Sequence, residues 1–173
     1  MAATLSPSLP AGVTASPAEP APGFVLDVYE HEWTIQRPRD AVWAWLCDPS
    51  TFVDGQIWPY RVEFEADEQG PGGFRPGVFN THSGPGINFA GVIGEIRPGE
   101  YRDLQYFYGS YAISHRLVRP TRLQFWAEDG PTEGSTVLRL QVDCHVRKRF
   151  VGPWSRVMSL FWPRFGKWAE SQS

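Results

Sequence analysis

The sequence contains little of what metal sites and disulfides are built from. Its 173 residues include two cysteines and four histidines. Cys47 and Cys144 lie in apolar segments without CxxC spacing, which predicts buried free thiols. The histidines show neither HxH nor HxxxH spacing, and no carboxylates accompany them at ligand intervals. We therefore expect no metal ion and no other cofactor.

Positive charge is also scarce. Lys and Arg number 16 against 19 Asp and Glu, which gives a net charge of −3. Because nucleic-acid-binding proteins usually present a basic face, we expect no nucleic-acid partner. The short basic run at 147–149 fits a solvated strand end better than a membrane-binding patch.

Long apolar runs and hydrolase motifs are missing as well. No segment is long and apolar enough to cross a membrane, and no Lys or Arg precedes an apolar stretch near the N-terminus. These absences predict a cytoplasmic protein with no integral membrane segment. There is no GxSxG motif, and the glycine clusters at 70–73 and 84–86 join predicted strands, so neither a nucleophilic hydrolase nor a phosphate-binding loop is expected.

The N-terminal 23 residues are rich in Ala, Pro and Ser and contain no aromatic side chain. Such a composition cannot bury enough apolar surface to order itself. We expect a disordered tail at 1–23 followed by a single domain at 24–173. Aromatic residues make up 14% of the chain, with eight Trp and eleven Phe, which suits a core and a small-molecule cavity alike.

Two periodicities follow the tail. Between Tyr29 and Gln36, apolar or aromatic residues alternate with polar ones, which predicts a strand buried on one side. After Pro38 the apolar residues take helical spacing, and Pro49 ends this helix. A second short helical turn is expected at 51–56.

Strands dominate the remaining sequence, and a helix closes it. From Gly152 the apolar residues again take helical spacing, and Pro163 is expected to kink or shorten that helix. Turn signals rich in Gly and Pro separate the expected strands, which lie at 60–66, 74–82, 87–96, 101–117, 121–127 and 136–148. The pattern at 101–117 fits one long strand or an interrupted one.

The segment RPRDAVWAWLCDPSTF resembles the opening motif of the START/Bet v 1-like superfamily, also called SRPBCC or the polyketide cyclase/dehydrase-like group. Three further segments, GEIRPGEY, GSTVLRLQVDC and GPWSRVMSLF, are similar to its mid-chain turn, last strand and C-terminal helix. The resemblance runs from Phe24 to Trp168, and only the opening motif is specific. The matching positions of that motif are Pro38, Val42, Trp43, Leu46, Asp48, Pro49 and Phe52.

This resemblance implies an α+β helix-grip fold. Six or seven antiparallel strands would wrap around a C-terminal helix, with two short helices after the first strand and an apolar cavity between sheet and helix. The expected partner is a small hydrophobic molecule, and a homodimer stays open as an assembly. Because the superfamily contains both enzymes and carriers, three functions remain open: a cyclase/dehydratase-like enzyme, a non-catalytic carrier or sensor of a hydrophobic metabolite or lipid, and an interaction module with a filled cavity.

The candidate catalytic residues are His31 and Tyr106, an imidazole and a phenol expected on dry faces. His31 also has a simpler interpretation, a core histidine bonded to a neighbouring strand. His145 is expected to be exposed on the polar side of the last strand. The strand phase of 101–117 is not fixed by the pattern. The candidate ligand-binding residues are Trp33, His82, Phe89, Tyr108, Tyr111 and His115.

Overall fold

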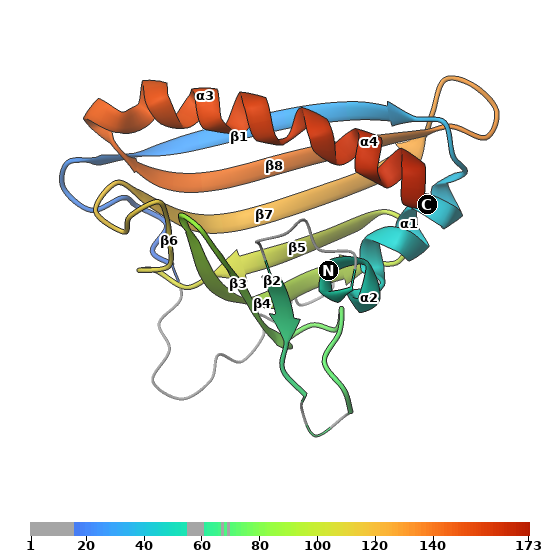
Figure 1. Cartoon of the computed structure of the whole chain (residues 1–173), viewed down its shortest axis with the longest axis horizontal. Helices are drawn as coiled ribbons and strands as arrows, with labels where there is room; N and C mark the ends of the chain where they lie inside the picture. Colours follow the sequence, from blue (N-terminus) through green and yellow to red (C-terminus); the bar gives the residue numbers. More distant parts are fainter. Residues whose placement is uncertain (1–15, 55–60, 67, 69) are drawn as a thin grey trace, which may run out of the picture.

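Alternating apolar and polar residues build one antiparallel sheet in the part of the chain that the computed structural model describes, residues 16–54, 61–66, 68 and 70–173. Seven strands follow one another in the order β1-β8-β7-β5-β4-β3-β2, and β6 pairs with β4 outside this path (Figure 1). The strands are β1 (Phe24–Ile35), β2 (Arg61–Phe64), β3 (Phe79–Gly84), β4 (Ile87–Arg97), β5 (Tyr101–Tyr106), β6 (Tyr111–Ala112), β7 (Val118–Asp129) and β8 (Thr136–Arg147).

The helices lie on one side of this sheet. Figure 1 shows α3 and α4 end to end along β1 and β8, with α1 and α2 near the C-terminal end of α4. Pro163 occupies the first turn of α4, where its missing N–H costs nothing, so the break between the two helices falls at Trp162. The bounds are α1 (Arg39–Cys47), α2 (Pro49–Val53), the 3-10 turn η1 (Lys148–Phe150), α3 (Val151–Phe161) and α4 (Pro163–Gln172).

The expected helix-grip architecture is confirmed. The strongest alternation, in β8, places Leu138, Leu140 and Val142 in the core, as predicted. The second helix comes slightly earlier than expected, because Asp48 caps it: the Asp48 Oδ1 accepts a hydrogen bond from the Ser50 N–H at 2.8 Å.

The stretch 101–117, expected as one long or interrupted strand, is interrupted: β5 ends at Tyr106 and only the two residues of β6 pair again. Two local predictions are wrong. Pro120 does not precede β7 but lies within it, at a break in register with β8 that accommodates its missing N–H. Residues 74–78 are not a strand, since β3 begins at Phe79.

The predicted N-terminal tail falls partly outside the described residues, since 1–15 are not described. Residues 16–23 touch the sheet and the turn that follows it: the Ser16 hydroxyl donates to the Tyr106 carbonyl in β5, and the Lys148 N–H in η1 donates to the Gly23 carbonyl at 3.2 Å. The disorder of the whole tail therefore stays a prediction.

The C-terminal helix is fixed to the sheet by aromatic side chains around Phe165. The Phe165 ring centroid lies 5.5 Å from that of Trp33 in β1, 5.4 Å from Trp45 in α1 and 5.4 Å from Phe125 in β7. The next residue, Gly166, is buried against Trp33, and a Cβ at this position would lie 2.2 Å from the Trp33 Cδ1. The close approach of α4 to β1 therefore requires a glycine.

This contact predicts opposite effects for two glycine-to-alanine changes in helices. Gly166→Ala should lower the free energy of unfolding by about 1–3 kcal/mol, because overpacking against Trp33 outweighs the better helix propensity of Ala. Gly152→Ala in α3 meets nothing within 4 Å and should be neutral or stabilising by up to about 1 kcal/mol. Urea denaturation of both variants would measure the difference, and a Gly166→Ala protein as stable as Gly152→Ala would contradict the packing argument.

Candidate functional site

Polar side chains gather on the helix-facing side of β3, β4 and β5. We call Asn80, His82, Phe89, Arg102 and Tyr106 the inner cluster. The strand register explains why they share one side: His82 pairs with Phe89, and Asn80 and Tyr106 both pair with Gly91. Arg102 lies four residues before Tyr106 on β5 and so faces the same way.

Three members of the inner cluster are in ring contact. The His82 ring centroid lies 6.2 Å from that of Phe89 and 5.9 Å from that of Tyr106, and the Phe89 and Tyr106 centroids are 5.3 Å apart. Tyr106 is buried, and burial raises the pKa of its phenol, against the opposing effect of Arg102. Tyr106 is therefore a protonated hydrogen-bond donor at neutral pH.

Asn80 determines which nitrogen of His82 carries the proton. The His82 Nε2 lies 3.1 Å from the Asn80 Oδ1. Because a carbonyl oxygen only accepts, Nε2 is the donor and the lone pair is on Nδ1. Burial, followed by the charge on Arg102, lowers the pKa of His82 to about 4. His82 is therefore neutral at pH 7, with Nδ1 as its acceptor.

Arg102 lies among aromatic rings. Its side chain is 2% exposed, and its guanidinium carbon is 4.3 Å from the Phe74 ring centroid, 4.9 Å from Phe125 and 5.5 Å from Phe52. No described residue offers a hydrogen-bond partner to its Nε or Nη1. Burial lowers the pKa of Arg102 to about 10, so it remains charged at neutral pH.

Cys47, at the end of α1, is close enough to Arg102 for the charge of Arg102 to affect the pKa of the Cys47 thiol. Burial raises the pKa of this thiol, and the positive charge on Arg102 opposes that rise. Cys144 is buried on the helix-facing side of β8, and burial raises its pKa too. Both cysteines are free thiols, as predicted, although Cys47 is only partly buried.

The predicted catalytic pair is not brought together. His31 lies on β1, between Tyr29 and Trp33, with its ring centroid 4.7 Å from that of Trp33. Its Nδ1 is 3.5 Å from the Tyr29 hydroxyl, on its own strand rather than a neighbouring one. β8 and β7 separate β1 from β5, which places the backbones of those two strands about 14 Å apart. Tyr106 therefore has His82, and not His31, as its imidazole neighbour.

The remaining predicted residues divide between two other places. Tyr111 and His115 contact each other near β6, with ring centroids 5.8 Å apart, and His115 is exposed. Tyr108 accepts a hydrogen bond from Arg119, and its ring lies 5.9 Å from that of His145. The expected exposure of His145 is wrong, since only 1% of it is exposed beneath Tyr108 and Arg119.

Arg102 and Asn80 were missed by the sequence interpretation. The residues Arg102, Leu104 and Tyr106 alternate with Tyr101, Asp103 and Gln105, and this alternation was available in the sequence. Every residue of β5 except Gln105 is buried, however, so the usual contrast between a wet and a dry side is lost.

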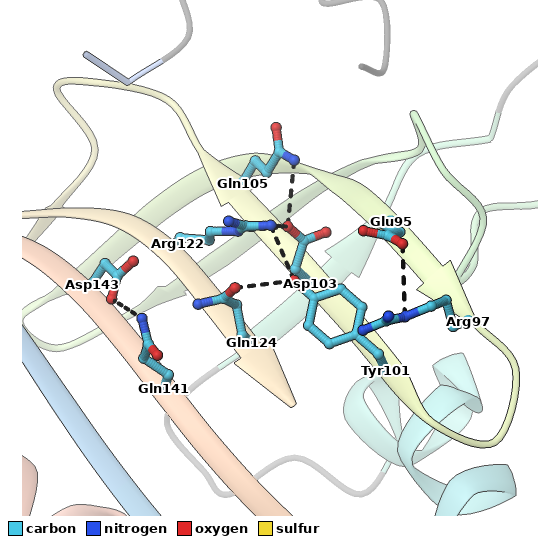
Figure 2. A network of polar contacts seen from close by, with 9 residues as sticks. All are labelled: Glu95, Arg97, Tyr101, Asp103, Gln105, Arg122, Gln124, Gln141 and Asp143. Atoms are coloured by element: carbon cyan, nitrogen blue, oxygen red, sulfur yellow. Dashed lines mark hydrogen bonds and ion pairs between the residues drawn. The ribbon is translucent and has the colours of Figure 1, made fainter. Parts of the chain in front are cut away.

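A second polar network lies on the opposite side of β5, and Figure 2 shows it from close by. The Asp103 carboxylate, whose side chain is 0% exposed, is 2.6 Å from the Arg122 Nη2 and 2.7 Å from its Nε. Arg122 also donates to the Tyr101 hydroxyl at 3.0 Å, which in turn donates to Gln124 at 3.0 Å. Burial disfavours the charge on Arg122, but Asp103 outweighs this and raises its pKa. A backbone glycine, Gly94, leaves the space that the Asp103 carboxylate fills.

Two surface grooves lie apart from the inner cluster. One, of about 560 Å³, runs between α1, α2 and the end of α4, and Trp45 and Trp168 form part of its wall. The other, of about 410 Å³, lies between the start of α1 and the β7–β8 turn. Among the described residues, no group of His, Cys, Asp and Glu side chains is arranged to hold a metal ion. Within the same residues, no helix has the length and apolar character needed to cross a membrane.

The buried Asp103 carboxylate predicts a large cost for removing its partner. Arg122→Met should lower the free energy of unfolding by about 2 kcal/mol, less than for a fully buried pair because Arg122 is itself 39% exposed. Arg139→Met removes an exposed ion pair with Glu32 (2.8 Å) and should have a much smaller effect. If chemical denaturation shows that both variants lose the same free energy of unfolding, the buried Asp103 carboxylate is not stabilised by Arg122.

The low pKa of His82 predicts a specific loss of stability in acid. The unfolded state takes up a proton near pH 6.5 and the folded state only near pH 4, so stability present above pH 6.5 is lost as the pH falls toward 4. Between pH 7 and 4.5 this amounts to about 2–3 kcal/mol. Urea denaturation at both values should show a weaker pH dependence for His82→Gln than for the wild type. His115→Gln, at an exposed site, is the control, and an unchanged slope in His82→Gln would contradict the assignment.

Sequence comparison finds no match among protein-family models or curated proteins. Structure comparison finds many. Norcoclaurine synthase from Thalictrum flavum, in complex with dopamine and hydroxybenzaldehyde, is 13% identical with a TM-score of 0.61, covering 86% of this chain and 87% of that one. MLL2253 from Mesorhizobium loti is 14% identical with a TM-score of 0.62, covering 84% and 96%. DynU16, from the dynemicin biosynthetic locus, is 19% identical with a TM-score of 0.54, covering 83% of this chain and 47% of that one.

These neighbours resemble this chain in fold and only weakly in sequence. At identities below 20%, the similarity supports a shared fold only, and the chemistry of the site has to be inferred from the residues of this chain. The chain therefore has the helix-grip fold of the START/Bet v 1-like superfamily.

Proposed function

We propose that this protein binds a small hydrophobic molecule on the helix-facing side of its sheet, at the inner cluster. The observation that carries the proposal is a set of polar groups held inside an aromatic interior, with Tyr106 as a donor and the His82 Nδ1 as an acceptor. Apolar sites with a few well-placed polar groups are typical of small-molecule binding. The neighbouring norcoclaurine synthase structure, which holds two small aromatic compounds, supports the same use of the fold.

The geometry favours a ligand with a carbonyl oxygen. The phenol of Tyr106 stays protonated and can donate a hydrogen bond to a carbonyl or enolate oxygen. His82, neutral and with its lone pair on Nδ1, can accept a hydrogen bond from a hydroxyl on the same ligand. Phe89 provides an aromatic surface beside both groups.

A cyclase/dehydratase-like reaction is a second candidate for the same site. In it, the His82 Nδ1 would remove a proton from carbon next to the carbonyl, and Tyr106 would stabilise the enolate oxygen. The arrangement of the two side chains favours this reaction, but the basicity of His82 does not. A general base works best with a pKa near the working pH, and that of His82 is about 4. Binding by a carrier or sensor is therefore the conclusion that the site supports best.

Two tyrosine variants test whether the Tyr106 hydroxyl donates a hydrogen bond to the ligand. Tyr106→Phe should weaken the binding of 2-acetonaphthone, a neutral aryl ketone, by about 3- to 10-fold, which corresponds to one lost hydrogen bond. Tyr108→Phe is the matched control, because Tyr108 contacts Arg119 and His145 on the other side of the sheet. Affinities from NMR titration would test this.

The outcomes also separate the functions. Conversion of the ketone or of related poly-oxo compounds by the wild type, lost in His82→Gln, would support the enzyme. Binding without conversion would support the carrier or sensor. No binding of any hydrophobic carbonyl compound would contradict the proposal and favour an interaction module with a filled interior.

A further inference from the structure

Among the residues that the structure describes, Arg102 is a buried cation without a counterion on its own side of the sheet. Its nearest acidic neighbour in sequence, Asp103, points to the opposite side, where Arg122 holds it at 2.6 Å. Among the described residues, no acceptor reaches the Nε or Nη1 of Arg102. Removing a guanidinium from water without hydrogen bonds is costly, and buried arginines are normally paired.

The aromatic rings around Arg102 offset only part of this cost. Phe52, Phe74 and Phe125 lie within 5.5 Å of the guanidinium carbon, in cation–π range. Ring faces attract the charge but accept no ordinary N–H···O hydrogen bond, so the donors on Nε and Nη1 have no acceptor among the described residues. A second donor in the same interior, the Nδ2 of Asn80, has no partner in the described part of the chain either, and Asn80 is 0% exposed.

The charge of Arg102 reaches the rest of the inner cluster. It is one of the causes of the low pKa of His82, and it opposes the rise in the pKa of Tyr106. A molecule bound beside His82 and Tyr106 therefore experiences the positive potential of Arg102 in a medium of low dielectric, where it is poorly screened.

We propose that Arg102 recognises the anionic end of the bound molecule, so that the ligand is a small aromatic or hydrophobic acid. A carboxylate or an enolate would accept hydrogen bonds from the Nε and Nη1 of Arg102, and the apolar body would lie against Phe89 and Tyr106. This inference rests on the proposed function and narrows its ligand class. Charge-assisted hydrogen bonds of this kind are stronger than neutral ones, especially away from water.

The Phe52 ring links Arg102 to the wall of a surface groove. Trp45 and Trp168 form part of the wall of the groove between α1, α2 and α4, and both rings contact Phe52, at centroid distances of 6.1 and 5.8 Å. The Phe52 ring in turn lies over Arg102. Because Phe52 contacts both the tryptophans of the groove wall and Arg102, we place the ligand's path to the cation past this ring.

A pair of probes with the same apolar body tests the inference on the intact protein. 2-Naphthoate carries a carboxylate, and methyl 2-naphthoate does not. The wild type should bind the acid at least about tenfold more tightly than the ester, the size expected for one charge-assisted hydrogen bond. Arg102→Met should lose this preference and still bind the ester. Calorimetric titration would give the affinities.

Stability separates a ligand-binding arginine from a structural one. If Arg102 serves a ligand, Arg102→Met should melt at a higher temperature than the wild type when no ligand is present, because an unpaired buried charge is removed. Naphthoate should raise the melting temperature of the wild type but not of the variant. A variant that unfolds more easily than the wild type would overturn the proposal in favour of a structural role.

A third measurement is made on the wild type and uses a conservative variant only to assign a resonance. The ¹⁵Nε resonance of Arg102, assigned with Arg102→Lys, should shift on addition of naphthoate and not on addition of the ester. Equal binding of acid and ester by the wild type would overturn the role of Arg102 and leave the proposed function standing. If the wild type binds neither probe, the role of Arg102 is overturned, and if it also fails to bind 2-acetonaphthone, the proposed function is overturned with it.

Discussion

The packing of Phe165 is the contact on which the rest of the architecture depends. This one ring touches the first strand through Trp33, the first helix through Trp45 and the centre of the sheet through Phe125. It can do so only because its neighbour Gly166 lets α4 approach Trp33 so closely. Elements from both ends of the chain are thereby held on one side of the sheet, and the inner cluster occupies the other half of that side, along β3 to β5.

Much of this architecture could be predicted, because it follows from periodicity that survives without tertiary information. The alternation in β1 and β8 and the position of Pro163 gave the strands, the terminal helix and its interruption. Residues 101–117 were predicted less completely, because the pattern left open whether they form one long strand or an interrupted one, and the structure has the interrupted form. Their break after Tyr106 depends on Tyr111 pairing with Asn88 of a neighbouring strand, a long-range contact that no local pattern reports.

The candidate site was predicted only in part, for a physical reason. His82, Phe89 and Tyr106 were expected and do come together, because strand-end residues of adjacent strands meet in the sheet. Arg102 was not expected, since a charged residue in an ambiguous strand is normally assigned to the wet side. His31 was assigned to the site because it lies on the mostly apolar side of β1. All residues on that side share this property along the whole strand, so it does not indicate how far His31 lies from β5.

The adjacent opposite charges of β5 also bear on how the chain reaches its native alignment. The pleat sends Arg102 to the aromatic interior and Asp103 to Arg122 on the other side. A slip of one residue would exchange them, placing a carboxylate among phenyl rings and one guanidinium beside another. Hydrophobicity alone would tolerate that slip, because both sides of β5 are buried. Charge therefore distinguishes the correct strand alignment from its nearest error, and it does so before any ligand is present.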